Sequence, residues 1–263
     1  MFPKKFLISS CQSDGGLHSL SLLKDNFILK EHIDTGNVRG VTEIGEKKYY
    51  VKNNSLYSYF DDNVKFEFVL PNYGHDIKYD NKLNVFWFAA TPDRAVYKLS
   101  VDGVILGSIL FDSKYWLNCI SLHEDCLIIF LSSKRPFPDS KIVCYTRELD
   151  FLWEYNCNPK DEIHSPVLFK GFLYWCISNK NLVVKSDVAN QLNEVINVVQ
   201  NNNGYTRGLY IDDDFLVVGT SENRHSENCR CISNINKATV NIYKKDEIVF
   251  SKILSCKEIY DIC

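Results

Sequence analysis

The sequence lacks long hydrophobic runs, an excess of basic residues and a helical repeat of apolar positions. Its longest apolar stretches, such as 126–131, have the length of a strand, whereas crossing a bilayer takes about 20 apolar residues. Lys and Arg number 30 against 33 Asp and Glu, so the net charge is -3 and the basic footprint of nucleic-acid binding is missing. We therefore expect neither a membrane nor a nucleic acid among the partners.

The N-terminus has no recognisable export signal. Two lysines at 4–5 are followed by only three apolar residues, 6–8, which is too short for the core of a signal peptide. Most of the ten cysteines lie inside apolar stretches, where free cysteine behaves as a small buried hydrophobe. These features predict a cytoplasmic protein with free thiols.

Linkers and familiar catalytic motifs are missing as well. No stretch rich in Pro, Gly or Ser divides the 263 residues, so we expect one domain over 1–263. The chain has no Gly-x-Ser-x-Gly elbow, no Gly-rich phosphate loop and no His-Glu-x-x-His pair. The sequence therefore carries no catalytic signature, and function must be inferred from its architecture.

What the sequence does contain is a weak internal repeat. Aromatic residues make up 13% of the chain, and short apolar runs end in turn-forming Asn, Asp, Gly and Lys, which indicates an all-β fold. Each repeat opens with a polar residue, which is followed usually by a small residue and then by an aliphatic one. These openings begin at Arg39, His75, Asn118, His164, Arg207 and Tyr260. Their spacing of 36 to 53 residues is typical of propeller blades with four strands each.

The two ends of the chain complement each other. After Tyr260 only one short strand remains, whereas 6–30 supplies three apolar strands without an innermost one. Counting from Tyr260 through the joined ends to Arg39 gives 42 residues, close to the other intervals. We therefore predict a six-bladed β-propeller closed by pairing the C-terminal innermost strand with the N-terminal strands, which removes an open sheet edge. A large β-sandwich or a five-bladed ring is the alternative.

The first residues of the inner strands of a propeller gather at one end of its central channel. We call this end the mouth, and the repeat predicts that it carries six polar or aromatic residues: Arg39, His75, Asn118, His164, Arg207 and Tyr260. Buried polar groups are costly without partners, so such a ring holds either water or a ligand. Crowded cations favour an anion, because a guanidinium binds carboxylate, phosphate or sulfate through paired hydrogen bonds.

We assign roles at the mouth on chemical grounds. Arg39 and Arg207 would bind a small anionic, sugar-derived metabolite, with Asn118 and Tyr260 orienting it. Two aspartates, Asp76 and Asp261, would either contact the ligand or neutralise the arginines internally. If the site is catalytic, His75 and His164 are the acid/base candidates, since imidazole titrates near neutral pH. A lyase or isomerase reaction by proton transfer (elimination, epimerisation or cyclisation) suits this set.

Metal sites have weaker support. His75 and His164 with Asp76 or Asp261 form a conceivable ligand set for a divalent ion in the channel, although no closely spaced ligand pair accompanies it. The long loops 133–139 and 221–237 could cover the mouth. The second contains His225, Cys229 and Cys231, which lack a fourth ligand for zinc. No cofactor is predicted with certainty, and a divalent metal in the channel is the one candidate.

The six repeat openings resemble those of six-bladed propellers of the NHL-repeat, strictosidine-synthase-like and gluconolactonase-like group, and also bacterial propellers of unassigned function. The resemblance covers the whole chain loosely and implies the fold. Gluconolactonase-like members hold a divalent metal through a channel acid and asparagines, but Asn118 is the only asparagine among these openings and no glutamate begins one. The catalytic glutamate of strictosidine synthase also has no counterpart, so the resemblance implies neither activity.

A different class of function remains open, namely a non-catalytic scaffold that binds a protein partner on the face of the propeller around the mouth. Four aromatic residues near the predicted loops are candidate anchors for such a partner: Tyr115, Trp116, Phe137 and Tyr205. A solvent-reachable pocket at His75 and His164 would favour an enzyme, and a flat apolar patch would favour the scaffold.

Overall fold

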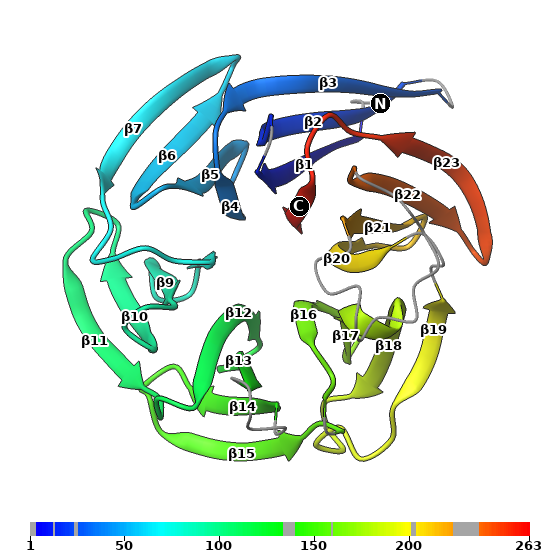
Figure 1. Ribbon diagram of the computed structural model, residues 1–263. Helices are drawn as coiled ribbons and strands as arrows, with labels where there is room; N and C mark the ends of the chain where they lie inside the picture. The colour runs from blue at the N-terminus through cyan, green and yellow to red at the C-terminus, as the bar shows by residue number, and fades with distance from the viewer. Residues whose placement is uncertain are drawn as a thin grey trace.

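The structure is a computed structural model that describes residues 4–12, 14–23, 26–133, 140–158, 160–200, 204–222 and 237–263. Within these residues the strands form six four-stranded sheets arranged in a ring (Figure 1). This confirms the six-bladed β-propeller and excludes the β-sandwich and the five-bladed ring.

Within each sheet the strands follow one another from the centre of the ring outwards. The closing sheet contains β24 (Glu258–Ile262), β1 (Lys4–Cys11), β2 (Gly16–Leu23) and β3 (Asn26–Thr35). The next contains β4 (Val38–Ile44), β5 (Lys47–Lys52), β6 (Ser55–Phe60) and β7 (Asn63–Val69). The third contains β8 (Asp76–Asp80), β9 (Val85–Ala90), β10 (Ala95–Ser100) and β11 (Ile105–Leu110).

The other three sheets have the same order. The fourth contains β12 (Tyr115–His123), β13 (Cys126–Ser133), β14 (Lys141–Thr146) and β15 (Phe151–Asn156). The fifth contains β16 (Ile163–Phe169), β17 (Phe172–Ile177), β18 (Leu182–Asp187) and β19 (Ile196–Gln200), with the short 3-10 helix η1 (Ser178–Lys180). The sixth contains β20 (Tyr205–Ile211), β21 (Leu216–Ser221), β22 (Thr239–Lys244) and β23 (Glu247–Ile253).

The ring closes between the two ends of the chain, as predicted. Strand β24 pairs antiparallel with β1, with Ile262 opposite Ile8 and Glu258 opposite Cys11. Beyond the last strand, Leu7 and Cys263 exchange two backbone hydrogen bonds of 2.7 and 3.0 Å. The C-terminal strand thus covers the edge that β1 would otherwise expose.

Burial follows the position of a strand within its blade. All six residues of β9 and of β21 are buried, because the faces of these second strands pack against neighbouring blades. Trp87 on β9 and Trp175 on β17 are among the largest fully buried side chains. The outermost strands, such as β11, leave most of their side chains exposed. The hydrophobic core therefore lies between the blades, and the polar openings of the repeat are left to line the centre.

A β-bulge marks the start of most inner strands. The register shifts beside the repeat opening in β4, β12, β16, β20 and β24, between Arg39 and Val41 for example. A bulge inserts one residue and re-aims side chains locally. The small second residue has a steric reason, because a Cβ on Gly40 would lie 2.6 Å from the Cα of Asp76 in the next blade. Blades can approach this closely only where that residue is small.

Candidate functional site

The six predicted residues lie at or near the beginnings of the six inner strands. These strands surround the centre of the ring (Figure 1). Five lie within β4, β12, β16, β20 and β24, and His75 directly precedes β8. Their contacts divide them into two groups. Arg39, His75 and Arg207 gather around Tyr260, whereas Asn118 and His164 bond to each other.

The first group is cationic and aromatic. The Cζ atom of Arg207 lies 3.7 Å from the ring centroid of Tyr260, and that of Arg39 lies 5.0 Å from the same ring. Arg39 also stacks on Tyr73, with 3.9 Å between Cζ and the ring centroid. His75 meets Tyr260 edge-on at 5.5 Å. Cation–π contacts hold both guanidiniums in place without neutralising their charge.

Both arginines keep donors that no other described residue satisfies. The buried Nε and Nη1 of Arg39 and the Nε of Arg207 have no hydrogen-bond partner in the described part of the chain. Arg207 is only 6% exposed, and within the same residues no ion pair joins either arginine to a carboxylate. An arginine remains protonated in proteins, and leaving its buried N–H groups unpaired costs about 1–3 kcal/mol each. This arrangement is suited to receiving an anion.

The second group is neutral and already hydrogen-bonded. Asn118 Nδ2 donates to Ser132 Oγ at 2.7 Å and lies 3.2 Å from His164 Nε2, which therefore acts as the acceptor. His164 Nδ1 then carries the proton and donates to Ser178 Oγ at 2.8 Å. This network holds His164 in one neutral tautomer. Its Nε2 lone pair is occupied, so in this state His164 is less available as a base.

The two aspartates form a second layer with a lysine that sequence reasoning missed. Lys78 Nζ lies 2.6 Å from Asp261 Oδ2 and 3.2 Å from Asp76 Oδ1, and it donates to the Val41 carbonyl at 3.2 Å. The carboxylates also accept backbone N–H groups from the following blade: Asp261 from Val41 at 3.0 Å and Asp76 from Ile120 at 2.9 Å. The alternative in which these aspartates neutralise the arginines is therefore wrong for the described residues.

The ammonium of Lys78 is shared between two carboxylates, and this arrangement shifts the pKa values of Lys78 and Asp76. Burial raises the pKa of Asp76 to about 7, an effect that Lys78 opposes and the Asp261 carboxylate reinforces. Burial by itself would lower the pKa of Lys78, but Asp261 and Asp76 together raise it. Lys78 therefore stays charged, and the raised pKa of Asp76 places the titration of this carboxyl group near neutral pH.

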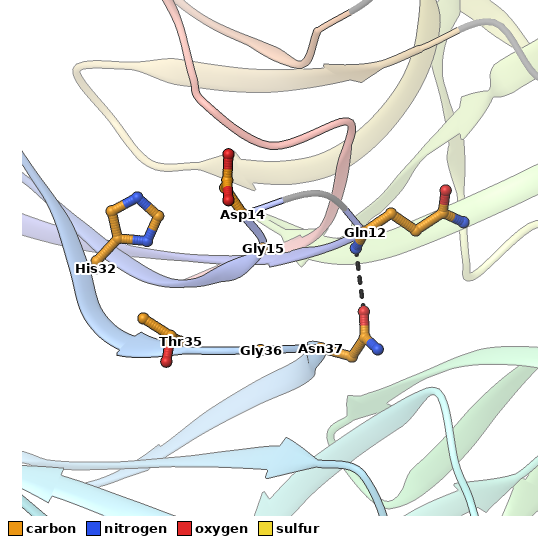
Figure 2. A pocket seen from close by; sticks show the side chains of 7 residues that line it. All are labelled: Gln12, Asp14, Gly15, His32, Thr35, Gly36 and Asn37. Atoms are coloured by element: carbon orange, nitrogen blue, oxygen red, sulfur yellow. Dashed lines mark hydrogen bonds between the residues drawn. The ribbon is translucent and has the colours of Figure 1, made fainter.

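A separate hollow of about 740 Å³ lies on the closing blade (Figure 2). The hollow belongs to the β1–β2 turn and the end of β3, and its lining residues are Gln12, Asp14, Gly15, His32, Thr35, Gly36 and Asn37. The backbone N–H of Gln12 donates to Asn37 Oδ1 at 3.0 Å across it. No spacing pattern in the sequence links these seven residues, so sequence reasoning missed the hollow.

His32 connects this hollow to a buried histidine. The His18 and His32 rings lie 5.3 Å apart, and His18 Nδ1 accepts the backbone N–H of His32 at 3.3 Å. His18 Nε2 then donates to Ser10 Oγ at 2.7 Å. Burial and the neighbouring His32 together lower the pKa of His18 to about 4, although the Glu31 carboxylate acts in the other direction. His18 is therefore a neutral structural residue.

Two of the four proposed anchors for a protein partner are wrong. Tyr115 and Tyr205 are both buried. The ring of Tyr205 packs against His164 at 5.6 Å, and its hydroxyl donates to Glu162 at 2.5 Å. Trp116 is 48% exposed and remains a candidate. Phe137 lies outside the described residues, as do His225, Cys229 and Cys231 and most of both long loops.

The described residues show neither a metal cluster nor a membrane-spanning helix. They contain no group of three or more His, Cys, Asp or Glu side chains arranged to hold a metal ion. Among the same residues, no helix has the length and apolar character needed to cross a membrane.

Comparison with known proteins identifies the fold alone. No family model matches the chain, and no curated protein matches it. Among solved structures, one from a nidogen/laminin complex has a TM-score of 0.72 at 11% identity and covers 98% of this chain and 97% of its own. A protein of unknown function from Bacteroides caccae has a TM-score of 0.70 at 9% identity, covering 100% and 98%. A luciferin-regenerating enzyme has a TM-score of 0.63 at 12% identity, covering 85% and 78%.

Proposed function

We propose that the mouth of the channel binds a small anionic molecule between Arg39 and Arg207. The observation that carries this proposal is the set of buried guanidinium N–H groups without partners in the described part of the chain. A carboxylate, sulfate or phosphate oxygen would satisfy these donors and balance the two charges. Because Asp76 and Asp261 are held by Lys78 in the layer beneath, they do not compete for the arginines.

The site is organised before the ligand arrives. Tyr73 and Tyr260 hold the guanidiniums by stacking, so little side-chain entropy is lost on binding. The ligand would lie beside His75, and its uncharged end would face the neutral group of Asn118 and His164. Hydroxyl groups at that end, as in a sugar-derived metabolite, would find hydrogen-bonding side chains there.

Catalysis is a further step of the proposal. His75 is the stronger acid/base candidate, because the lone pair of His164 is already occupied by Asn118. Proton transfer to or from a bound carboxylate-bearing carbon would give elimination, epimerisation or cyclisation, which are lyase or isomerase reactions. The similarity in fold to a structure named as a luciferin-regenerating enzyme is compatible with an enzymatic role. We also propose a cytoplasmic location, in keeping with the eight free cysteines of the described residues.

The test is a thermal-shift titration with acetate, sulfate, phosphate and a panel of hydroxylated carboxylates. A ligand that binds the folded state raises the melting temperature by mass action. We expect a saturable shift in the wild type that is abolished in Arg39→Met and Arg207→Met. Arg94→Met is the matched control, since Arg94 lies in the β9–β10 turn, outside the inner strands that carry the residues of the mouth, and should leave the shift unchanged.

Two results would count against anion binding. One is the absence of a shift with any anion, and the other is a shift of equal size in all four proteins. Either would favour the scaffold, for which Trp116 is the remaining described anchor. A loss of binding in Arg94→Met alone would place the anion elsewhere on the propeller.

A further inference from the structure

Two cysteines face each other at the end of the fourth blade that lies opposite the mouth. Strand β12 runs away from the mouth, so the turn that follows it and the first residue of β13, Cys126, lie at the other end. In the β13–β14 register Cys126 is opposite Thr146, and Ile128 is opposite Cys144. Side chains two residues apart share a face of a sheet, so Cys126 and Cys144 are diagonal neighbours on one face. The two thiols are close enough for each to shift the pKa of the other.

The two thiols have different environments. Cys144 is fully buried, whereas Cys126 is partly exposed beside the β12–β13 turn. The neighbouring Cys144 lowers the pKa of the Cys126 thiol, burial opposes this, and the Arg147 guanidinium lowers the pKa further. The Glu124 and Asp125 carboxylates act in the other direction. In turn Cys126 raises the pKa of Cys144. Cys126 is thus the accessible nucleophile, and Cys144 is the protonated partner behind it.

Arg147 is itself fixed in place. It forms a buried ion pair with Asp80, and Asp80 also accepts the indole N–H of Trp87 at 3.2 Å. The positive group near Cys126 is therefore held by the third blade, across the boundary between blades. Both cysteines also belong to the hydrophobic cluster between the fourth and fifth blades.

We propose that Cys126 and Cys144 are a redox-active thiol pair that a hydroperoxide converts into a reversible disulfide. The Cys126 thiolate attacks the peroxide, so that an S–O bond forms, the O–O bond breaks and the leaving hydroxide takes a proton to become water. Cys144 then attacks the sulfenic sulfur of Cys126. An S–S bond forms, the S–O bond breaks, and the Cys144 proton leaves with the hydroxide as a second water. The two thiols lose two electrons and the peroxide gains them.

The diagonal arrangement makes this disulfide labile. Diagonal neighbours in an antiparallel pair lie about 7–8 Å apart, whereas a disulfide usually joins Cα atoms about 4.4–6.8 Å apart. The strands must therefore shift to form the bond, and a strained disulfide is readily reduced. The pairing of β14 with β15 is interrupted by a bulge between Cys144 and Tyr145, next to the residue that would have to shift. The pair is thus suited to reversible oxidation and unsuited to a permanent structural role.

The experiment treats the folded protein with limiting hydrogen peroxide and follows each cysteine by differential alkylation and mass spectrometry. Cys157 is the matched control, because it is also partly exposed but burial raises the pKa of its thiol to about 12. We expect Cys126 to react more than about tenfold faster than Cys157. A Cys126–Cys144 linked peptide should accumulate and disappear on addition of dithiothreitol.

Two variants test the order of the steps. In Cys144→Ser the sulfenic acid of Cys126 should persist and be captured by dimedone, and in Cys126→Ser the buried Cys144 should stay reduced. The melting temperature of each variant confirms that it is folded. Equal rates at Cys126 and Cys157 would overturn the proposal. So would a dimedone adduct at Cys126 in the wild type without any linkage to Cys144.

Discussion

Two layers of side chains at the centre of the ring hold charged groups, and they differ in how that charge is balanced. The inner layer is the second layer described above, formed by Lys78, Asp76 and Asp261. In it Lys78 lies between the two carboxylates, and both carboxylates also accept backbone N–H groups from the neighbouring blade. At the mouth Arg39 and Arg207 stack on aromatic rings but retain buried N–H groups without described partners. Among the described residues the inner layer has all its charges paired, and the mouth does not.

This difference separates a layer with a structural role from the mouth, where we propose that an anion binds. The inner layer joins the β8, β4 and β24 strands, and β24 is the strand that closes the ring. Its charges are satisfied whether or not a ligand is bound. The mouth contains similar charges, yet within the described residues several of its buried guanidinium donors have no partner. Substitutions in the two layers can test this contrast, and the largest effect is expected in the inner layer.

Replacing Lys78 should destabilise the protein most. In Lys78→Met two carboxylates would remain side by side without a cation, and breaking a buried pair costs about 3–5 kcal/mol. The free energy of unfolding from urea titration measures this loss. Lys65→Met is the control, because Lys65 pairs with Glu67 at the surface and such pairs contribute about 0–1 kcal/mol. Equal losses in both variants would remove the distinction between the inner layer and ordinary surface charge.

The inner layer should also respond to pH through Asp76. Its pKa is raised to about 7 in the folded protein, so the folded state binds the proton more tightly than the unfolded chain. The resulting stabilisation is complete below the ordinary pKa of the carboxyl group and is lost as pH rises through about 7. We therefore expect the wild type to lose stability relative to Asp76→Asn between about pH 5 and about pH 8.

Urea titrations at the two pH values provide the comparison. Asp125→Asn is the control, because Lys82 lowers the pKa of Asp125 and its titration lies below this window. If the difference between wild type and Asp76→Asn does not change with pH, Asp76 is ionised throughout and Lys78 balances both carboxylates.

Removing a charge at the mouth should change the free energy of unfolding far less than removing the charge of Lys78. In ligand-free protein, Arg207→Met loses the cation–π contact with Tyr260 but also relieves a buried N–H without a described partner. These effects offset each other, so the free energy of unfolding should change by no more than about 1 kcal/mol. A loss as large as that of Lys78→Met would show that Arg207 has a structural partner and would weaken the anion site.

The smallest effect is expected at Trp116. Its side chain is 48% exposed, so Trp116→Ala should change the free energy of unfolding by about 0.5 kcal/mol or less and leave anion shifts unaltered. Urea and thermal-shift titrations check both statements. A variant that keeps its stability but loses a bound protein partner would revive the scaffold.

Much of the fold could be predicted from local patterns, and less of the site. The repeat openings identified the inner strands because a polar and an aliphatic residue recur at the spacing of the blades. In some openings a small residue, such as Gly40, stands between them where neighbouring blades approach closely. Lys78 escaped notice because nothing in its own strand distinguishes it from a solvated lysine. Its partner Asp261 is 183 residues away in the sequence. The buried positions of Tyr115 and Tyr205 were missed for the same reason, since packing between blades decides them.

The sequence by itself determined the number of blades, the closure by the last strand and the identity of the six residues at the mouth. These depend on repeat spacing and on the alternation of apolar and polar residues, which are local properties of the chain. Only the tertiary structure decided which charges are paired, which tautomer His164 adopts and which cysteines meet. Such properties depend on distances between strands far apart in the sequence, because hydrogen bonds and ion pairs form over a few ångströms and no spacing rule encodes them.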